Sequence, residues 1–338
     1  MRIASRFVEE PGILIHGVLH CSEPACQQEY PVLDGIPILV PNVRAYLADN
    51  LVQLTRRSDL PEALESLLGD AVGQGTAYDA TRQHLSTYAW DHYEDLAPQR
   101  SPSEATPGAV TRCLEEGLAL LGTGESVSAP VLDIGCSVGR SAFDLAARTD
   151  GLVLGVDVNF SMLQVAHGVL RTGTVRYPRR RVGLVYDRRT FPVELRGCDR
   201  VDFWVCDALA LPFPSATFAF ASALNVIDCV ASPHGFLHAV AGALHPGARA
   251  LLSTPYDWSA NVTPVEAWIG GHSQRGPDQG ASEPLLRRLL DPEAHPPGGV
   301  AALRLLGERE RVRWQARLHE RSTVEYAVHL VAVEVGHS

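Results

Sequence analysis

Apolar runs of strand length alternate with helical segments from residue 129 onward, and this alternation constrains the fold more than any other feature. The strand-like runs are APVLDIG, LVLGVDV, VDFWVCD, FAFASALNV and ARALLST, and the segments between them include SAFDLAAR, FSMLQVAHGVL and FLHAVAGAL. This alternation predicts parallel strands covered by helices on both faces. We therefore expect a doubly wound α/β domain over residues 129–338, with a closing strand within His319 to Glu334.

Two smaller units precede this domain. Residues 1–45 contain short β-rich runs around a Pro/Gly turn and predict a small β unit. Residues 46–128 have helical apolar spacing and predict a helical connector or lid. Two segments interrupt the later alternation, at residues 172–199 and 270–299. Because long irregular insertions usually serve as binding loops or lids, we expect both near a substrate.

Charge and composition narrow the class of protein. The formal net charge of -10 disfavours a nucleic-acid partner, and we interpret the local basic run Arg179 to Arg181, with Arg188 and Arg189, as a solvated loop. There is no apolar run of membrane-spanning length and no secretory signal, so we expect a cytoplasmic protein without a membrane segment. The seven cysteines are interpreted as free thiols.

The segment VLDIGCSVGR places a glycine-rich turn at the carboxyl end of the first strand of this domain, with a helix beginning near Gly139. Doubly wound sheets bind nucleotides at this place, and glycine allows the backbone to approach a ligand closely. The amides of such a turn suit a carboxylate or a phosphate, so the turn alone leaves the nucleotide type open. The candidate contacts of this turn are Gly135, Cys136, Ser137, Gly139 and Arg140.

Aspartates at three predicted strand ends decide between these ligands. Asp133 precedes the turn, where it would attract an ammonium group, directly or through water, and repel a pyrophosphate. Asp157, with Val158, ends the next strand and is placed to accept ribose hydroxyls. Asp207 and Ala208 follow a third strand, where an adenine would lie. Together they predict S-adenosyl-L-methionine as cofactor, with S-adenosyl-L-homocysteine as product, although each aspartate alone is also compatible with a helix cap or turn.

Two other ligand classes fit the turn less well. Gly135-x-Ser137-x-Gly139 has the spacing of a serine hydrolase elbow, with Asp228 and His272 or His319 as generic partners. That alternative leaves the three strand-end aspartates unexplained. A nicotinamide cofactor requires G-x-G-x-x-G, whereas this turn has Gly135, Ser137 and Arg140 at those offsets. A third alternative is a non-catalytic, cofactor-binding partner of another enzyme.

The order VLDIGCSVGR, GVDVN, CDALALPF, NVIDCV and HPGARALLSTPYDW resembles the class I methyltransferases over residues 129–258. This resemblance implies a seven-stranded sheet of order 3-2-1-4-5-7-6, with Asn225 and Asp228 beside the methyl group and Asn225 also at the cofactor. STPYDWSANVTPVEAWIGG is similar to the 4-mercaptohistidine N-methyltransferase domain of ovothiol synthesis, which implies a histidine-type imidazole as the small-molecule acceptor. The chain lacks the sulfoxide-synthase domain of that pathway and carries an N-terminal unit of its own.

The N-terminal piece GVLHCSEPACQQEYPVLDGIPILVPN resembles the zinc-ribbon-like domain of tRNA-methyltransferase activators, with YP-x-x-DGIP-x-L as the shared motif. Such domains often bind zinc through two cysteine pairs. Here only Cys21 and Cys26 are present, with His16 and His20 at irregular spacing. We therefore expect a metal-free unit and no metal site elsewhere.

Methyl transfer is an in-line displacement, so we expect residues that align the acceptor and exclude water rather than a covalent nucleophile. An imidazole acceptor also needs its tautomer held by a hydrogen bond. We predict Asn225 and Asp228, with Tyr88 and His92, as the catalytic residues. The predicted substrate contacts are Tyr88, His92 and Tyr93 on one helix, the aromatic residues Tyr256, Trp258 and Trp268, and Glu266 for an amino group. Packing against the core is the alternative for the aromatic residues.

Overall fold

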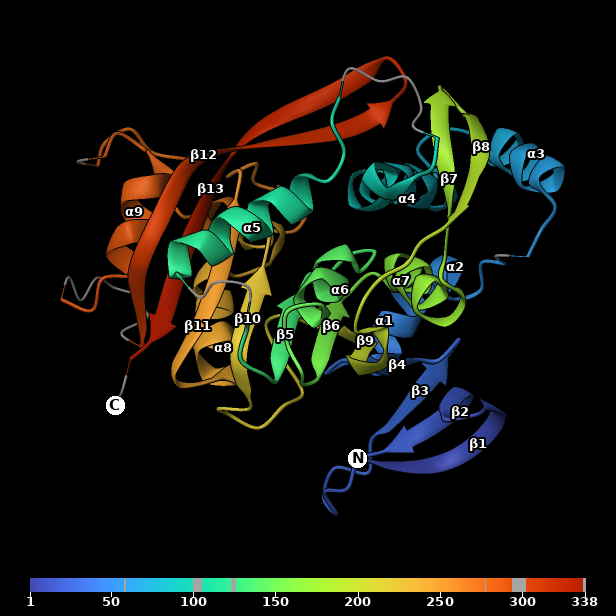
Figure 1. Cartoon of the computed structure of the whole chain (residues 1–338), viewed down its shortest axis with the longest axis horizontal. Helices are drawn as coiled ribbons and strands as arrows, with labels where there is room; N and C mark the ends of the chain where they lie inside the picture. Colours follow the sequence, from blue (N-terminus) through green and yellow to red (C-terminus); the bar gives the residue numbers. More distant parts are fainter. Residues whose placement is uncertain (58, 100–104, 123–125, 277, 294–301, 337–338) are drawn as a thin grey trace.

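The computed structural model describes residues 1–57, 59–99, 105–122, 126–276, 278–293 and 302–336. Its main feature is one large mixed sheet with strand order β1-β2-β3-β4-β9-β6-β5-β10-β11-β13-β12 (Figure 1). The central strands β9, β6, β5, β10 and β11 pair in parallel, whereas β13 is antiparallel to both β11 and β12. The predicted α/β class is confirmed.

The strands of this sheet fall into three groups. The N-terminal strands are β1 (Arg2–Glu10), β2 (Ile13–His20), β3 (Glu29–Leu33) and β4 (Ile36–Leu39). The parallel strands are β5 (Val131–Ile134), β6 (Val153–Asp157), β9 (Val201–Cys206), β10 (Phe218–Ala223) and β11 (Leu244–Thr254). The last two are β12 (Leu303–His319) and β13 (Ser322–Val335).

The helices come mostly from the two regions where helical spacing predicts them. Before the parallel strands lie α1 (Val43–Asp49), α2 (Leu51–Leu54), α3 (Glu62–Val72), α4 (Ala77–Tyr93), η1 (Glu94–Leu96) and α5 (Ala109–Leu121). Between and after them lie α6 (Arg140–Ala146), α7 (Phe160–Thr172), η2 (Cys198–Arg200), η3 (Ile227–Cys229), α8 (Pro233–Ala243), η4 (Val265–Ala267) and α9 (Ser282–Leu289).

The central sheet separates two hydrophobic cores because its strands are apolar on both faces. Within β5, Val131 packs in the core with Leu85 of α4 and Phe143 of α6. Its neighbour Leu132 packs in the other core with Phe236 of α8. Adjacent side chains of a strand point to opposite faces, so a strand covered on both sides reads as a continuous apolar run. This is why the runs from residue 129 onward predict the strands correctly.

The sheet is larger than the seven strands we expected. Strand β4 pairs in parallel with β9, with Ile38 opposite Val205 and Leu39 opposite Cys206, so the N-terminal strands continue the main sheet. Seven of the eleven strands, numbered along the chain from β5 and omitting β7 and β8, lie in the order 3-2-1-4-5-7-6. The boundaries 1–45, 46–128 and 129–338 stay predictions. Residues 277 and 294–299 of the predicted 270–299 insertion lie outside the described residues.

The insertion at residues 172–199 is a β-hairpin rather than an irregular loop. Strands β7 (Thr174–Val182) and β8 (Val185–Pro192) pair with each other in a separate two-stranded sheet. Val175 and Tyr177 are buried, because alternate residues of β7 face the protein interior. The arginines between them obscured this period-2 pattern in the sequence.

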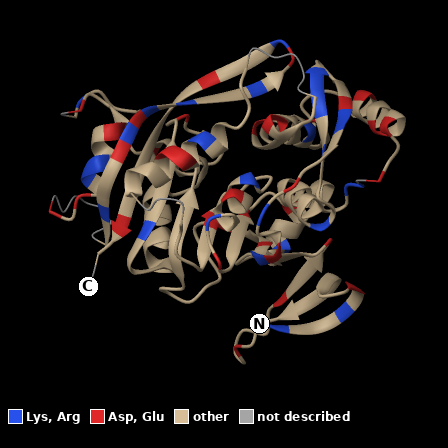
Figure 2. Ribbon diagram, in the orientation of Figure 1, with Lys and Arg blue, Asp and Glu red and all other residues tan. Residues whose placement is uncertain are grey.

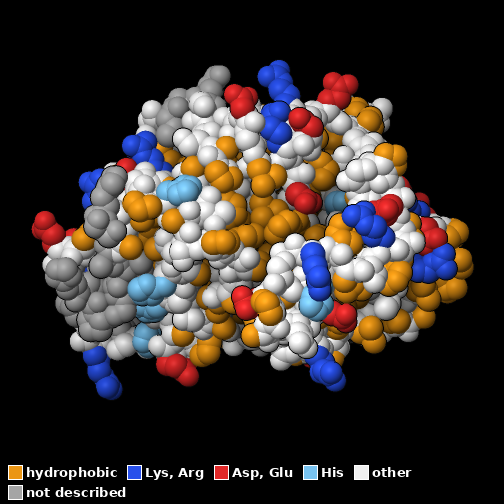
Figure 3. Space-filling view, turned by 90° about the horizontal axis from the view of Figure 1, so that it is seen from below, with side chains coloured by type: hydrophobic (Ala, Val, Ile, Leu, Met, Phe, Trp, Pro, Cys, Tyr) orange, Lys and Arg blue, Asp and Glu red, His pale blue; other side chains and the backbone are white. Residues whose placement is uncertain are grey.

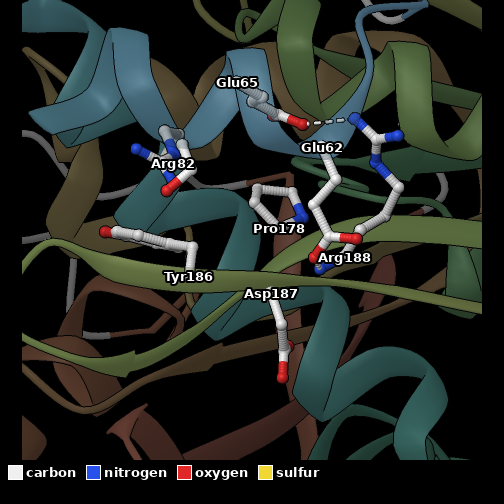
Figure 4. Close-up of a pocket in the computed structure, with 8 residues that line it drawn as sticks. Glu62, Glu65, Arg82, Pro178, Tyr186, Asp187 and Arg188 are labelled. Carbon is white, nitrogen blue, oxygen red and sulfur yellow. Dashed lines mark hydrogen bonds and ion pairs between the residues drawn. The ribbon is translucent and has the colours of Figure 1, made fainter.

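Four arginines of this hairpin, Arg179, Arg181, Arg188 and Arg189, form ion pairs with acidic groups, and Figure 2 shows acidic residues on α3 and α4 next to the basic residues of β7. Arg179 pairs with Asp187 at 2.6 Å, Arg188 with Glu65 at 2.6 Å and Arg189 with Glu94 at 3.0 Å. The Glu65 pair closes a small cavity between α3 and the hairpin (Figure 4). Figure 3 shows a further face on which basic, acidic and hydrophobic side chains are interspersed. The basic run therefore forms internal ion pairs, which gives it no particular suitability for a phosphate backbone.

Candidate cofactor and acceptor site

The glycine-rich turn between β5 and α6 has a backbone that only glycine tolerates at two positions. Gly135 has φ 68°, and a Cβ there would lie 2.6 Å from Cγ2 of Val226. Gly139 has φ 91°, and a Cβ there would lie 2.7 Å from Cβ of Ala166. The amides of Gly135 and Cys136 both donate to the carbonyl of Val156, at 2.7 and 3.1 Å. The turn is thus fixed against β6 by backbone hydrogen bonds and by the lack of space for side chains.

Asp157 lies at the end of β6, directly beside this turn. Its Oδ2 accepts a hydrogen bond from the Ser137 amide at 2.9 Å, and its Oδ1 accepts one from the Asn159 amide at 2.8 Å. Burial raises the pKa of this carboxyl group above its usual value, although the amides oppose the shift. The next residue, Val158, leaves 55% of its surface exposed. The Asp157 carboxylate and the exposed Val158 side chain therefore lie next to each other beside the turn.

Asp133 lies behind the turn. Its two carboxylate oxygens accept hydrogen bonds from Ser141 and Ser222, and the Ser141 bond measures 2.6 Å. Burial raises the pKa of Asp133 to about 6, against the effect of the two hydroxyls. Asp133 is thus buried with a protein donor on each oxygen. Its contact with a ligand ammonium stays a prediction, and a contact through water or through Ser141 fits this placement better than a direct one.

Asp207 and Ala208 follow β9, the strand next to β6. Asp207 is partly buried, and its Oδ1 accepts a hydrogen bond from the Leu209 amide at 2.9 Å. The carboxyl ends of neighbouring parallel strands lie at the same edge of a sheet, so Asp157 and Asp207 flank one region. In doubly wound sheets this edge is where ligands bind.

Three of the predicted site residues support the turn from inside the protein. Tyr93 is fully buried, and its hydroxyl donates to the carbonyl of Val138 at 2.6 Å. The Arg140 guanidinium is held by Asp95, Asp144 and the carbonyl of His92. His92 is only 3% exposed, and burial and the nearby Arg140 lower its pKa to about 3. His92 and Tyr93 therefore pack in the core, which is the alternative given for this helix, and their contacts with a substrate stay predictions.

Tyr88 differs from these neighbours on α4. Its side chain is 42% exposed, yet enclosure by protein raises the pKa of the phenol, and Cys229, Asp157, Tyr326 and Asp228 add to this shift. The groups around it come from β6, η3 and β13, so several elements converge on this region. Sequence analysis missed Cys229 and Tyr326, because nothing in their local sequence sets them apart.

Asp228 lies on η3, after β10. It is 1% exposed, and burial raises its pKa above the usual value. Its Oδ2 accepts a hydrogen bond from the Asp257 amide at 2.9 Å, and the Thr254 hydroxyl is a further donor near this carboxylate that lowers its pKa, whereas no donor among the described residues lies within hydrogen-bond distance of Oδ1. A buried oxygen without a donor costs about 1 to 3 kcal/mol. Asp228 is therefore suited to receive a donor from a ligand.

Asn225 stands between β10 and Asp228 in a left-handed conformation, with φ 58°. Its amide donates to the hydroxyl of Ser253, and this hydroxyl donates back to Asn225 Oδ1 at 2.9 Å. This pair holds the end of β10 against the end of β11. It fixes the direction in which the chain continues to Asp228.

The predicted aromatic wall is a stacked cluster in the loop after β11. The rings of Trp258 and Trp268 are parallel within 11° at 5.8 Å, and Tyr256 lies 6.2 Å from Trp258. All three side chains are partly buried, so they pack against each other and also retain exposed surface. Glu266, on η4, is exposed. The roles of these four residues in substrate binding stay predictions.

The serine hydrolase alternative has no support in this geometry. The Ser137 hydroxyl donates to the sulfur of Met162 at 3.6 Å. Nδ1 of His272 contacts the carbonyl of Gly270, and Nδ1 of His319 accepts from the Arg321 amide. No histidine side chain hydrogen-bonds Ser137 within the described ranges. The aspartate at the turn instead binds the Ser137 amide.

Neither a metal site nor a membrane span emerges from the described part of the chain. No group of three His, Cys, Asp or Glu side chains there is arranged to hold a metal ion. The described helices include none that is both long and apolar enough to cross a bilayer. In the N-terminal unit, His16 accepts a hydrogen bond from the Asp34 amide, while Cys21 and Cys26 are free.

A known protein family matches the part of the chain that contains the glycine-rich turn and the strand ends described above. Residues 132–252 match the family described as methyltransferase domain. The methyltransferase GfsG of Streptomyces halstedii is 25% identical over 55% of this chain and 63% of its own length. The O-methyltransferase cnsE of Penicillium expansum is 26% identical over 53% of this chain and 56% of its own. The chain thus spans less than two thirds of either relative. A solved structure of a methyltransferase from Methanosarcina mazei has a TM-score of 0.39 at 19% identity, covering 62% of this chain and 92% of its own.

Proposed function

We propose that the protein is a class I S-adenosylmethionine-dependent methyltransferase, which the methyltransferase-domain match over residues 132–252 supports, and that it methylates an imidazole nitrogen of a small molecule. The best candidate is histidine or a histidine derivative. The observation that carries the imidazole part is the buried Asp228 carboxylate, one oxygen of which has no donor among the described residues. An imidazole N–H supplies such a donor.

The cofactor is S-adenosylmethionine, and the chain contains suitable groups for each part of it. We assign its ribose hydroxyls to Asp157 and its adenine to the region of Val158, Asp207 and Ala208. We place the methionine part of the cofactor along the turn from Gly135 to Gly139, where the amides of Gly135, Cys136 and Ser137 are already bonded to Val156 and Asp157 and hold the turn in shape. The close packing of protein side chains around Gly135 and Gly139 fixes the backbone of this turn beside the proposed cofactor position.

When bound, the cofactor would supply the methyl group of its sulfonium to an in-line nucleophile, with the thioether as the leaving group. In the proposed reaction, Asp228 Oδ1 accepts a hydrogen bond from one ring nitrogen of the acceptor, which leaves the lone pair of the other nitrogen directed at the methyl carbon. The N–C bond forms as the S–C bond breaks. The ring N–H proton then passes to Asp228, whose pKa is raised by burial, and this leaves a neutral methylated imidazole.

Tyr88 and the Tyr256, Trp258 and Trp268 cluster supply the surroundings of the acceptor in this proposal. Aromatic side chains that are partly exposed give a flat, apolar surface for a ring and exclude water from it. Glu266 suits an amino group on the acceptor. Its exposure means that this contact contributes little beyond selectivity.

Calorimetric titration with S-adenosylhomocysteine tests the cofactor part. We expect micromolar binding to the wild-type protein and at least about tenfold weaker binding to Asp157→Ala. Asp150→Asn, at an exposed carboxylate away from the turn, is the matched control. Absence of binding to the wild-type protein would contradict the methyltransferase activity itself.

Methyl transfer to histidine, histidine derivatives and amines without a ring tests the acceptor part. We expect a product methylated on the imidazole, with the position given by NMR spectroscopy, and about a hundredfold loss of kcat/KM in Asp228→Asn at unchanged affinity for S-adenosylhomocysteine. A product methylated on oxygen or carbon would overturn the imidazole acceptor and leave the methyltransferase assignment standing.

A further inference from the structure

A chain of hydrogen bonds connects the loop after β11 with three other elements. The hydroxyl of Tyr256 lies 2.7 Å from Nδ1 of His329 on β13. Nε2 of the same histidine lies 2.9 Å from Oε2 of Glu308 on β12. Glu308 in turn accepts a hydrogen bond from Nε of Arg287 on α9, also at 2.9 Å. We call Tyr256, His329 and Glu308 the positioning chain.

The donors and acceptors of this chain follow from its chemistry. Burial raises the pKa of Glu308, but the hydrogen bonds of Arg287 and His329 outweigh it and hold this pKa below its usual value, so Glu308 is an ionised acceptor. His329 therefore donates through Nε2, and in its neutral form Nδ1 accepts from the Tyr256 hydroxyl. His329 is 1% exposed, so water does not compete with these bonds.

The positioning chain lies where the pairing of β11 with β13 ends. Thr254, the last residue of β11, is paired with His329 across the β11–β13 ladder. Tyr256 lies two residues further on, in a left-handed conformation with φ 56°, and its side chain reaches back to the same histidine. The Tyr256 amide also donates to the Thr254 hydroxyl at 2.9 Å. These contacts fix the first turn of the loop beyond the sheet.

Two features of the proposed acceptor site depend directly on this first turn. The next residue, Asp257, donates its amide to Asp228 Oδ2. Trp258 follows and packs between Tyr256 and Trp268. A shift of Tyr256 would therefore move both the donor that holds Asp228 and the stacked rings.

We propose that Tyr256, His329 and Glu308 are positioning residues that align Asp228 and the Trp258–Trp268 stack for the acceptor, without touching the reacting atoms. This inference rests on the proposed function, because it assigns the purpose of the aligned groups. It predicts that the positioning chain affects turnover of the acceptor and does not affect cofactor binding. The Tyr256 side chain transmits the alignment from β12 and β13 to the loop.

Two substitutions of His329 test its hydrogen bond to Tyr256 and its hydrogen bond to Glu308 separately. His329→Asn keeps an acceptor near the place of Nδ1 for Tyr256, whereas His329→Gln keeps a donor near the place of Nε2 for Glu308 and loses the acceptor. Tyr256→Phe removes the hydroxyl alone. Tyr186→Phe is the control, because Tyr186 lies on β8, outside the loop, and its hydroxyl is not bonded to Tyr256, His329 or Glu308.

Three measurements are made on each variant: affinity for S-adenosylhomocysteine, kcat and KM for the acceptor at saturating cofactor, and the near- and far-ultraviolet circular dichroism of the coupled tryptophans. We expect Tyr256→Phe and His329→Gln to lower kcat/KM at least about tenfold, with cofactor affinity changed less than about twofold. His329→Asn should recover part of the loss. Tyr256→Phe combined with His329→Gln should cost no more than the worse single variant, because both remove one contact.

The circular dichroism keeps the inference testable if no acceptor is turned over. Trp268→Phe defines the spectrum without the stack, and Tyr256→Phe should move the wild-type spectrum toward it while Tyr186→Phe does not. Failure of the wild-type protein to bind S-adenosylhomocysteine or to methylate any imidazole would count against the proposed function alone. A Tyr256→Phe protein that matches the control in spectrum and kinetics, or that loses cofactor affinity as strongly as activity, would overturn the positioning role.

Discussion

The turn from Gly135 to Gly139 and the loop from residue 255 to 271 form the two halves of one proposed site, but they are built in different ways. The turn owes its shape mainly to the lack of space for a Cβ at two glycines, where Val226, Ala166 and Phe203 already fill the space. The loop owes its shape to side chains from η3, β12 and β13. Steric exclusion at two glycines therefore defines the cofactor half, and side-chain hydrogen bonds define the acceptor half.

This difference matters for how each half tolerates change. A steric requirement is absolute, because an added atom has to displace its neighbours. A hydrogen bond contributes about 1 kcal/mol to stability, and its loss changes the geometry only gradually. We therefore expect substitutions in the turn to act on stability and cofactor binding, and substitutions in the loop to act on use of the acceptor.

The largest effect is expected from Gly139→Ala. A Cβ there would lie 2.7 Å from Cβ of Ala166 and 2.8 Å from Cζ of Phe203, and φ is 91°. We expect a loss of about 3 kcal/mol or more in the free energy of unfolding, measured by urea denaturation, together with loss of S-adenosylhomocysteine binding. Gly168→Ala on α7 is the control, because nothing lies within 4 Å of its Cβ position. A fully stable Gly139→Ala protein would show that the turn is not sterically defined.

Asp157→Asn should have the next largest effect, because it removes a charge and keeps the shape. The two amides that bind the carboxylate would lose a charged acceptor. We expect affinity for S-adenosylhomocysteine to fall about tenfold, as measured by calorimetry, with a smaller change in thermal stability. If Asp157→Asn raised the KM for the acceptor by the same factor as it weakened cofactor binding, the two halves would not be separable.

The two buried carboxylates, one in each half, predict a pH dependence of stability. The pKa of Asp133 is raised from 3.8 to about 6, so the folded state favours the protonated form. Its contribution to stability is therefore fully present below pH 3.8 and is lost as the pH rises through 6. Urea denaturation between pH 4 and 7 should give a flatter profile for Asp133→Asn than for the wild type. Asp228→Asn should change the profile in the same direction, since burial also raises that pKa.

The smallest effect is expected from Trp268→Phe in the loop. The substitution keeps an aromatic ring but reduces the area that stacks on Trp258. We expect KM for the acceptor to rise about twofold to fivefold, with kcat and cofactor affinity nearly unchanged. Steady-state kinetics with the methylated product quantified by mass spectrometry would measure this. A change in cofactor affinity instead would link the loop to the turn and weaken the comparison.

Sequence reasoning succeeded where the information is local and failed where distant segments meet. The apolar runs identified β5, β6, β9, β10 and β11, because strands covered on both faces must be apolar throughout. The arginines of β7 and β8 hid the hairpin, since their ion pairs with Asp187, Glu65 and Glu94 are visible only in three dimensions. The helical spacing of Tyr88, His92 and Tyr93 did not reveal that only Tyr88 would stay exposed.

The sequence by itself determined the α/β class and the glycine-rich turn, because both depend on neighbouring residues and on backbone sterics. Only the tertiary structure decided that the N-terminal strands join the main sheet, through the pairing of β4 with β9. It also decided that Asp133 is enclosed by two hydroxyls and that Tyr256 is held by His329. These contacts join segments far apart in the chain, and their geometry depends on how the whole sheet twists and packs, which no local pattern encodes.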